Sequence, residues 1–243
     1  MTQSDSENIH YVDVAIMGAG MVGTALALSL KDTSLSIALI DGQVSEKLQA
    51  VTVISDSVES FKPRVSALTL ASRNLLRDIG VWDGISSQQV LSYQKMNVWD
   101  QLGSAEINFD AAELYCDELG FIVENQTLVS SLHLSIGNQA NLTGYFGCFL
   151  ESITPSKDKA GAYVLSLNNG QKVHCDLLVA ADGANSKVRT ILGMATREWD
   201  YQHYAIVATV QTEKSHDGVA RQRFSESGPL AFLPLQDKHA SEK

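Results

Sequence analysis

The sequence is poor in cysteine, proline and positive charge. Its three cysteines, Cys116, Cys148 and Cys175, lie far apart without a C-x-x-C, which argues against a disulfide framework or a cysteine metal site. Lysine and arginine total 18 against 28 acidic residues, for a formal net charge of −10. Because no basic cluster interrupts this acidic balance, we expect no nucleic-acid partner.

The sequence also lacks the hydrophobic runs that direct a chain into or across a membrane. No apolar stretch approaches the roughly 18 residues that span a bilayer. The first ten residues are polar and have neither the basic start nor the apolar core of a signal peptide. These features predict a cytoplasmic protein. The 243 residues, 44% of them hydrophobic, suffice for one large or two interleaved domains with a substantial core.

The most informative motif present is Gly18-Ala-Gly20-Met-Val-Gly23, which lies between a strand-like run at 12–17 and a helix-like run at 21–30. In such a unit the first glycine permits a tight turn, the second lets the backbone approach a pyrophosphate, and the third allows close helix–strand packing. The phosphates then lie on unpaired N–H groups at the helix start. A glycine-rich turn without a ligand is the alternative, which the flanking elements disfavour.

A second apolar run, at 36–40, ends in Asp41, 23 residues after Gly18. A carboxylate at this point can accept hydrogen bonds from the hydroxyls of an adenosine ribose, and its charge would repel a 2′-phosphate. We therefore expect the pocket to take FAD or NAD in preference to NADP.

The other informative motif is Asp182-Gly183-Ala-Asn-Ser186-Lys-Val-Arg189. It follows the apolar run 177–181, which is typical of a strand buried on both faces of a parallel sheet. The chain must turn at Asp182-Gly183, Ser186 can cap the helix that follows, and Arg189 lies on the same face of its first turn. Taken alone, the motif is also compatible with a plain turn after a core strand.

This second motif resembles the D-G-x-x-S-x-x-R fingerprint of the class A flavoprotein monooxygenases of the para-hydroxybenzoate hydroxylase type. All four fixed positions are present, as Asp182, Gly183, Ser186 and Arg189. In that family the segment helps to hold the FAD pyrophosphate and contributes to the use of NAD(P)H. The resemblance implies an α/β fold in which a Rossmann-like FAD-binding domain is interleaved with a mostly antiparallel β-sheet substrate domain, with FAD as cofactor and NAD(P)H as co-substrate.

Further segments are similar to the ubiquinone-biosynthesis flavin hydroxylases over nearly the whole chain, at 64–76, 80–83, 108–114, 120–125 and 199–224. The stretches 205–213 and 228–235 are most similar to members that hydroxylate a polyprenylphenol ring at C5, with members acting at C6 of a later benzoquinol close behind. The resemblance implies a lipophilic phenol or quinol substrate. It also implies association with a membrane surface or a ubiquinone-biosynthesis complex, peripheral to the inner membrane.

The family analogy adds two residues to the predicted cofactor site. Arg64 would approach the FAD phosphates, a role that suits a guanidinium fork, although its sequence context alone equally predicts a solvated surface arginine. Asn125 stands where relatives often place Arg or Gln near the cofactor. No residue is identified as a general base, since in this family the flavin carries the oxygen chemistry.

The resemblance also predicts how the chain is divided. Residues 1–87 and 120–192 would form the FAD-binding domain, and 88–119 and 193–243 an incomplete substrate domain. Relatives carry a third fingerprint, G-D followed by small residues and His, which grips the ribityl chain, and this sequence has no such segment. We therefore expect the chain to be the N-terminal portion of a longer enzyme.

Local patterns predict the remaining elements. A helix is expected at 66–79, closed by Gly80 and burying Leu68, Leu75 and Leu76 on one side. Ser45 to Lys62 is expected to form a loop. Other expected elements are antiparallel strands around 96–98 and 105–109, a helix at 126–136, a hairpin at 163–181, and strands at 205–211 and 220–224.

Other chemistry finds little support. The six histidines show no H-x-x-x-H spacing, and 225–228 lacks the first glycine of a nucleophile elbow, so we expect neither a metal site nor acyl transfer. Two further hypotheses remain open. One is a non-catalytic FAD-binding fragment. The other is an NAD-dependent dehydrogenase that uses 18–41 alone, which the Asp182 motif disfavours.

Overall fold

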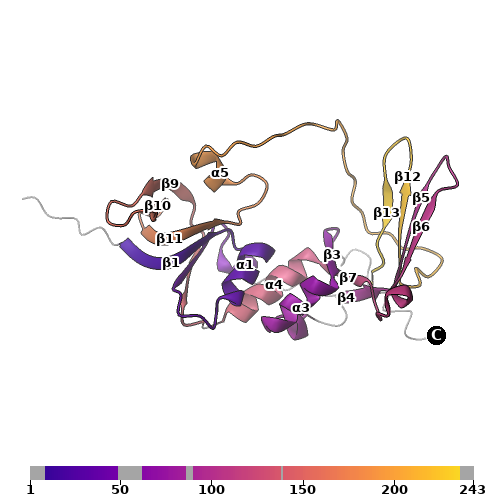
Figure 1. The fold of residues 1–243 in the computed structure, drawn as a ribbon, viewed down its shortest axis with the longest axis horizontal. Helices are drawn as coiled ribbons and strands as arrows, with labels where there is room; N and C mark the ends of the chain where they lie inside the picture. The colour runs from indigo at the N-terminus through magenta and orange to yellow at the C-terminus, as the bar shows by residue number, and fades with distance from the viewer. Residues whose placement is uncertain (1–8, 49–61, 86–89, 138, 236–243) are drawn as a thin grey trace, which may run out of the picture. The chain divides into compact units, whose positions relative to one another are not determined.

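The computed structural model describes residues 9–48, 62–85, 90–137 and 139–235. The chain divides into two compact units that interleave along the sequence (Figure 1). Unit 1 comprises residues 1–50 and 132–204, and unit 2 comprises 51–131 and 205–243. The expected domains interleave as well but have other boundaries, and their functional division stays a prediction.

Unit 1 is built on a six-stranded sheet in the order β8-β2-β1-β11-β10-β9. The parallel strands are β1 (Ile9–Met17), β2 (Ile37–Asp41), β8 (Leu142–Phe146) and β11 (Lys172–Ala180). An antiparallel edge is added by β10 (Tyr163–Leu167) and β9 (Leu150–Pro155). Helix α1 (Met21–Ser29) connects β1 to β2, which confirms the predicted strand–helix–strand unit and the α/β class.

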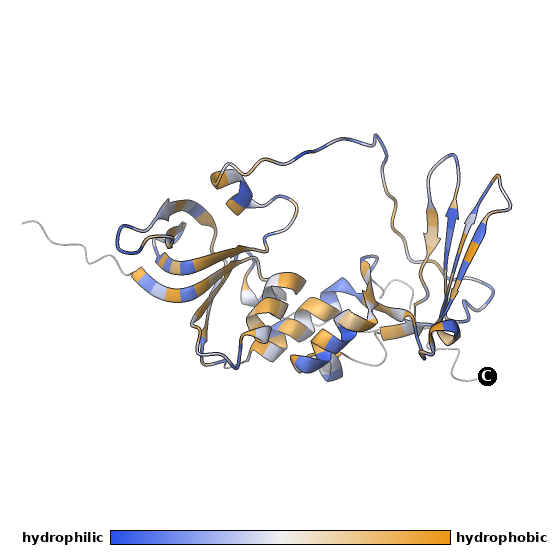
Figure 2. Cartoon of the chain, in the orientation of Figure 1, coloured by the Kyte–Doolittle hydropathy of each residue, from blue (hydrophilic) through white to orange (hydrophobic). Residues whose placement is uncertain are grey.

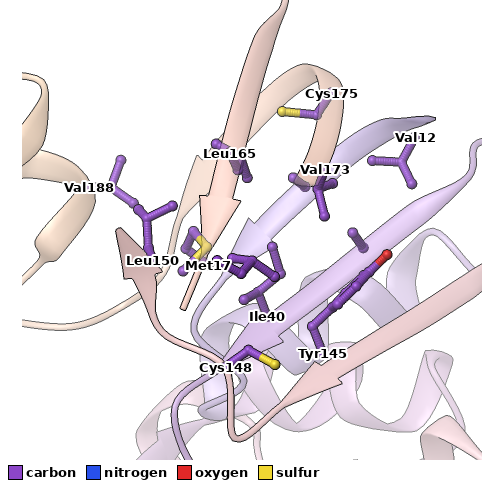
Figure 3. Packing of buried hydrophobic residues seen from close by; sticks show 13 residues of the cluster. Val12, Met17, Ile40, Tyr145, Cys148, Leu150, Leu165, Val173, Cys175 and Val188 are labelled. Carbon is purple, nitrogen blue, oxygen red and sulfur yellow. The ribbon is translucent and has the colours of Figure 1, made fainter. Parts of the chain in front are cut away.

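The central strands of this sheet are apolar on both faces because both faces are buried. Ile37 and Leu39 are at most 1% exposed on one face. The alternate residues Ala38 and Ile40 belong to a cluster on the other face that includes Val188 (Figure 3). Val188 comes from α5 (Lys187–Ile191), so the short helix after the second motif packs against the sheet. Burial of each such aliphatic side chain is worth about 1.5–3 kcal/mol.

Strand β11 corrects one expectation. The run 177–181 was expected to be buried on both faces, yet Leu177 is 55% exposed. The first half of β11 pairs with both β1 and β10, whereas residues 177–180 pair with β1 alone among the described strands. The predicted hairpin between β10 and β11 is confirmed, with Gly170 at φ +80° in its turn.

Unit 2 contains two sheets. An antiparallel three-stranded sheet consists of β3 (Val65–Thr69), β7 (Gly120–Glu124) and β4 (Val90–Tyr93). A four-stranded sheet consists of β13 (Leu230–Phe232), β12 (Val219–Phe224), β5 (Lys95–Asp100) and β6 (Glu106–Asp110). Only the β5–β12 pair in this sheet is parallel, so the expectation of a mostly antiparallel sheet holds. Much of β12 is hydrophilic, because Arg221, Gln222 and Arg223 follow one another (Figure 2).

Helices and 3₁₀ turns make up the other regular elements of the described residues. They are α2 (Ser45–Leu48), α3 (Leu70–Asp78), the 3₁₀ turns η2 (Trp82–Gly84) and η4 (Ala111–Leu114), and α4 (Asn125–Ile136). The predicted helix at 126–136 is confirmed as α4, which begins in unit 2 and ends in unit 1. Among the helices of the described segments, none combines the length and the apolar character needed to cross a bilayer.

Three segments differ from their expected local structure. The helix expected from residue 66 begins at Leu70, because residues 65–69 pair with β7 and Thr69 caps the helix by accepting from Ser72 N–H at 3.2 Å. Its expected buried side also fails, since Leu75 is 48% exposed and only Leu76 is buried. No strand is described at 205–211. The loop expected at 45–62 begins with α2, and residues 49–61 lie outside the described part.

Candidate dinucleotide site

The two sequence motifs meet where β1, β2 and β11 end side by side. Met17 is aligned with Ile40 of β2 and with Ala180 of β11. Just beyond this register, Gly18 N–H donates to Ile40 O and Ala181 N–H donates to Met17 O, both at 2.7 Å. The carboxyl ends of three parallel strands therefore present both motifs at one edge, the usual position of ligand sites in open α/β sheets.

Gly18 is in direct contact with the second motif. Its φ is +98°, and a Cβ placed on it would lie 2.4 Å from Ala181 O and 2.8 Å from Asp182 Cα. Both the backbone conformation and the available space therefore require glycine. The close approach of Gly18 to Ala181 and Asp182 joins the two motifs into one site.

Gly23 and Gly20 differ sharply in their surroundings. A Cβ on Gly23 would lie 1.9 Å from Gly18 O, so helix α1 closes tightly onto the turn. A Cβ on Gly20 would meet no protein atom within 4 Å, and Gly20 has an ordinary φ of −73°. The protein itself does not need glycine at position 20. The free space beside Gly20 fits the predicted approach of a pyrophosphate to the backbone.

Asp41 holds the glycine turn at its centre. Its Oδ2 accepts from Ala19 N–H at 2.6 Å, and its Oδ1 accepts from Gln43 N–H at 2.7 Å. A carboxylate offers about four lone-pair positions, so each oxygen retains the capacity to accept one more hydrogen bond. The predicted contact with a ribose hydroxyl is compatible with this geometry and stays a prediction.

Two buried side chains, Thr24 and His133, hold the carbonyl of Ala19. Thr24 Oγ1 donates to Ala19 O at 3.0 Å, and His133 Nε2 lies 2.7 Å from the same oxygen. Sequence reasoning did not single out His133 and missed this contact. The sequence carried no local signal for this contact, because it joins residues 114 positions apart.

The second motif forms a self-contained turn. Asp182 Oδ1 accepts from Ser186 Oγ–H at 2.6 Å, while Oδ2 accepts from Lys187 N–H at 2.7 Å and from Val188 N–H at 3.2 Å. Ser186 Oγ in turn accepts from Arg189 N–H at 3.1 Å, which confirms the predicted cap of α5.

The carboxylate of Asp182 thus satisfies the first N–H groups of α5. Gly183 provides the positive φ of +83° that the turn needs, and the Arg189 guanidinium returns to Ala184 O. The contacts of Asp182, Gly183 and Arg189 with a cofactor stay predictions.

Arg64 and Asn125 lie together in unit 2. Asn125 N–H donates to Arg64 O at 3.0 Å, and Asn125 Oδ1 accepts from Ser66 Oγ–H at 2.6 Å. The adjacent Glu124 is only 8% exposed, and burial raises the pKa of its carboxyl although Lys62 N–H donates to it. The other predicted residues, Gly18, Gly20, Gly23, Asp41, Asp182, Gly183 and Arg189, belong to unit 1.

Comparison with known proteins gives the same assignment as the geometry. Residues 11–242 match the family described as FAD binding domain. The chain belongs to this FAD-binding family. FAD is the family's cofactor, as the sequence predicted.

The curated relatives confirm the resemblance to ubiquinone-biosynthesis monooxygenases. The chain is 35% identical to the ubiquinone biosynthesis monooxygenase COQ6, mitochondrial, of Xenopus tropicalis, covering 94% of this chain and 50% of that protein. It is 33% identical to the 3-demethoxyubiquinol 3-hydroxylase of Escherichia coli (strain K12), covering 94% and 56% respectively. The chain therefore spans about half the length of these relatives.

Solved structures show the same fold. A structure of PqsL from Pseudomonas aeruginosa, described as a probable FAD-dependent monooxygenase, superposes with a TM-score of 0.68 at 18% identity, covering 93% of this chain and 58% of that one. This likeness confirms the expected arrangement of a Rossmann-like sheet interleaved with a second, mostly antiparallel sheet.

Proposed function

We propose that this chain is the FAD-binding portion of a monooxygenase that hydroxylates a lipophilic phenol or quinol ring in ubiquinone biosynthesis, with NAD(P)H and O₂ as co-substrates. The names of the relatives support this class of reaction. The proposal extends to hydroxylation of a polyprenylphenol ring at C5, with hydroxylation of the later benzoquinol at C6 as the alternative.

The observation that carries the proposal is the junction of the two motifs around an accessible glycine. Gly18 lies against Ala181 and Asp182, while the space beside Gly20 is free of protein atoms. Helix α1 also starts without a side-chain cap, so its first N–H groups remain available for an anionic group. A dinucleotide pyrophosphate satisfies both the space and the donors.

The residues described here fit FAD, and each has a defined task. The Gly20 backbone and the start of α1 would bind the pyrophosphate, and Asp41 would bind the ribose. FAD, when bound and reduced by NAD(P)H, supplies the chemistry that activates O₂ for transfer of one oxygen atom to the ring. The Asp182 carboxylate already accepts hydrogen bonds from N–H groups of α5. Because the backbone at Ala181 and Asp182 lies against Gly18, the Asp182 turn would instead position the phosphate-binding turn.

The test is a titration of the 243-residue chain with FAD followed by flavin fluorescence, repeated with NAD or NADP present as a competitor. We expect FAD to bind and NADP not to bind this site. Gly20→Val should fold normally, because its Cβ meets no protein atom within 4 Å, but should lose FAD, because the side chain fills the pyrophosphate space.

Gly84→Val is the matched control, since Gly84 also has free space around it and lies in η2 of unit 2. The control should bind FAD normally. A folded Gly20→Val protein that still binds FAD with unchanged affinity would show that the site is assigned wrongly.

The alternative concerns residues 1–243 by themselves, which span about half of these relatives' length. We propose in the alternative that these residues alone bind FAD without completing ring hydroxylation. We further propose that the protein works at the surface of a membrane or in a ubiquinone-biosynthesis complex, where a prenylated substrate is found. Sedimentation with lipid vesicles, with and without added prenylphenol, tests this placement.

A further inference from the structure

His133 is a buried histidine with a single well-defined task in the described structure. It lies on α4, is 2% exposed, and its Nε2 is 2.7 Å from Ala19 O and 3.3 Å from Thr24 Oγ1. A carbonyl oxygen can only accept, so Nε2 carries the proton and His133 donates. Because Thr24 Oγ1 donates to the same oxygen, both lone pairs of Ala19 O are used.

The orientation of Ala19 O determines the orientation of the next N–H group. Ala19 C=O and Gly20 N–H belong to one planar trans peptide, in which the two groups point in opposite directions. Holding Ala19 O toward α4 and Thr24 therefore directs Gly20 N–H away from them. Among the described residues Gly20 N–H has no hydrogen-bond partner.

The preceding peptide is fixed as well. Its N–H, on Ala19, donates to Asp41 Oδ2 at 2.6 Å. Two consecutive peptide planes of the turn are thus held, one by Asp41 and the other by His133 with Thr24. A turn that is ordered before its ligand arrives loses less conformational entropy on binding.

The ring of His133 is itself held in place. Phe146 of β8 meets it edge to face, with ring centroids 5.7 Å apart. His133 is itself only 2% exposed, so the ring has little room to turn.

From this geometry we propose that His133 is a positioning residue, which aims Gly20 N–H at the pyrophosphate through its hydrogen bond to Ala19 O. The proposal rests on the FAD site proposed above. It assigns His133 no contact with FAD and no part in the chemical step.

The experiment compares three variants of the 243-residue chain. His133→Met removes the donor and keeps an apolar side chain, whereas His133→Gln keeps an amide donor of similar reach. His174→Met is the matched control, because His174 is also buried in unit 1 and its Nε2 is 2.8 Å from Ser156 Oγ. His174 lies on β11 opposite Tyr11, near the other end of β1.

Two measurements are made on each variant. The first is the FAD dissociation constant, together with the melting temperature of the free chain. We expect His133→Met to bind FAD about tenfold more weakly and His133→Gln to recover most of that loss, since one hydrogen bond of this kind is worth about a factor of ten. His174→Met should lower the melting temperature without weakening FAD binding.

The second measurement is the ¹⁵N–¹H resonance of Gly20 in the chain without FAD. We expect it to shift in His133→Met and to stay in place in His174→Met. If His133→Met binds FAD as the unmodified chain does and leaves the Gly20 resonance unmoved, His133 is only a packing residue and the proposal is wrong.

The two proposals can fail separately. If the unmodified chain does not bind FAD, the proposed function fails, but the Gly20 resonance still decides the role of His133. If His133→Met does not fold, Thr24→Val removes the other donor to Ala19 O with little change of shape. Thr24→Val should then shift the Gly20 resonance and weaken FAD binding, as expected for His133→Met. An unmoved resonance together with an unchanged FAD affinity would overturn the proposal.

Discussion

At the scale of single residues, the glycine turn shows how one motif combines structural and ligand requirements. Gly18 and Gly23 are required by the protein, because Cβ atoms there would lie within 2.4 Å and 1.9 Å of backbone oxygens. Gly20 has no such neighbour. Substitutions at these positions should therefore separate stability from binding.

Gly18→Ala should destabilise the chain even in the absence of FAD. The new Cβ would collide with Ala181 O and would force alanine to a positive φ, a strain of about 1–2 kcal/mol before the collision is counted. Thermal unfolding followed by circular dichroism should show a lower midpoint for Gly18→Ala and a nearly unchanged one for Gly20→Ala. Equal midpoints for the two variants would contradict the contact between the motifs.

Asp41→Ala should weaken FAD binding through two effects. It removes the predicted acceptor for the ribose and releases Ala19 N–H, which Asp41 Oδ2 holds at 2.6 Å. Hydrogen bonds to a charged group are worth about 1.5–3 kcal/mol, so the affinity should fall roughly ten- to hundredfold. Isothermal titration of FAD measures this loss.

Asp13→Ala is the control for Asp41→Ala. Asp13 also accepts hydrogen bonds at the sheet, from Ser36 N–H and Ser36 Oγ–H, and those bonds hold its pKa below the ordinary value. It bonds Ser36, immediately before β2, and not the glycine turn. The control should therefore lower stability and leave FAD affinity intact, and unchanged affinity in Asp41→Ala would remove that residue from the site.

At the scale of elements, α5 of unit 1 and α3 of unit 2 both begin with N–H groups that side chains of the preceding loop satisfy. Asp182 and Ser186 together satisfy the first N–H groups of α5, and Thr69 caps α3. Helix α1 alone among these three lacks a side-chain cap. The uncapped helix is the one that the motif assigns to phosphate binding.

Strand β7 ends at Glu124, whose buried carboxyl should destabilise the folded chain by an amount that depends on pH. Burial raises the pKa of Glu124 above its ordinary 4.5, so the folded chain binds the proton more tightly than the unfolded chain does. Stability contributed by this group therefore decreases as pH rises from the unfolded pKa through the folded one. This loss of stability is complete above the pKa that Glu124 has in the folded chain and absent below its pKa in the unfolded chain.

Glu124→Gln should accordingly raise the melting temperature at pH 7 and have little effect near pH 4, where the carboxyl is already protonated. Glutamine keeps an acceptor for Lys62 N–H and removes the charge. The measurement is a series of thermal melts across this pH range. Glu106→Gln, an exposed substitution on β6, is the control and should show no comparable dependence; equal curves for both variants would refute the argument.

At the scale of the whole molecule, the main fact is that the chain spans about half of its curated relatives. The sequence has no third fingerprint of the kind that grips the ribityl chain in the family. We expect residues 1–243 alone to hold the adenosine and pyrophosphate parts of FAD more firmly than the flavin ring. Oxygen transfer to a substrate needs a site that excludes water.

Residues 1–243 supplied with FAD, NADPH, O₂ and a short-chain polyprenylphenol should therefore yield hydrogen peroxide and little hydroxylated phenol. Product analysis by chromatography and a peroxide assay measure the two outcomes. The full-length Escherichia coli relative, assayed with its own substrate, serves as the positive control. Hydroxylated product in proportion to the NADPH consumed would show that these residues suffice for the reaction.

Sequence alone predicted the features that depend on neighbouring residues. These features are the glycine spacing, the acid at the end of β2, the cap at Ser186 and the hairpin before Asp182. They follow from local backbone and hydrogen-bonding requirements, which do not depend on distant parts of the chain. The family resemblance then supplied FAD and the class of reaction, because those motifs are specific when they occur together.

Only the tertiary structure decided the features that depend on distant partners. Residues 65–69 became a strand because β7 is available to pair with them, although their pattern also fits a helix. Leu177 is exposed because the second half of β11 has β1 as its one described neighbour. The contact between His133 and Ala19 joins residues 114 positions apart. No local pattern encodes such a contact, since it exists only once the sheet and its helices have packed.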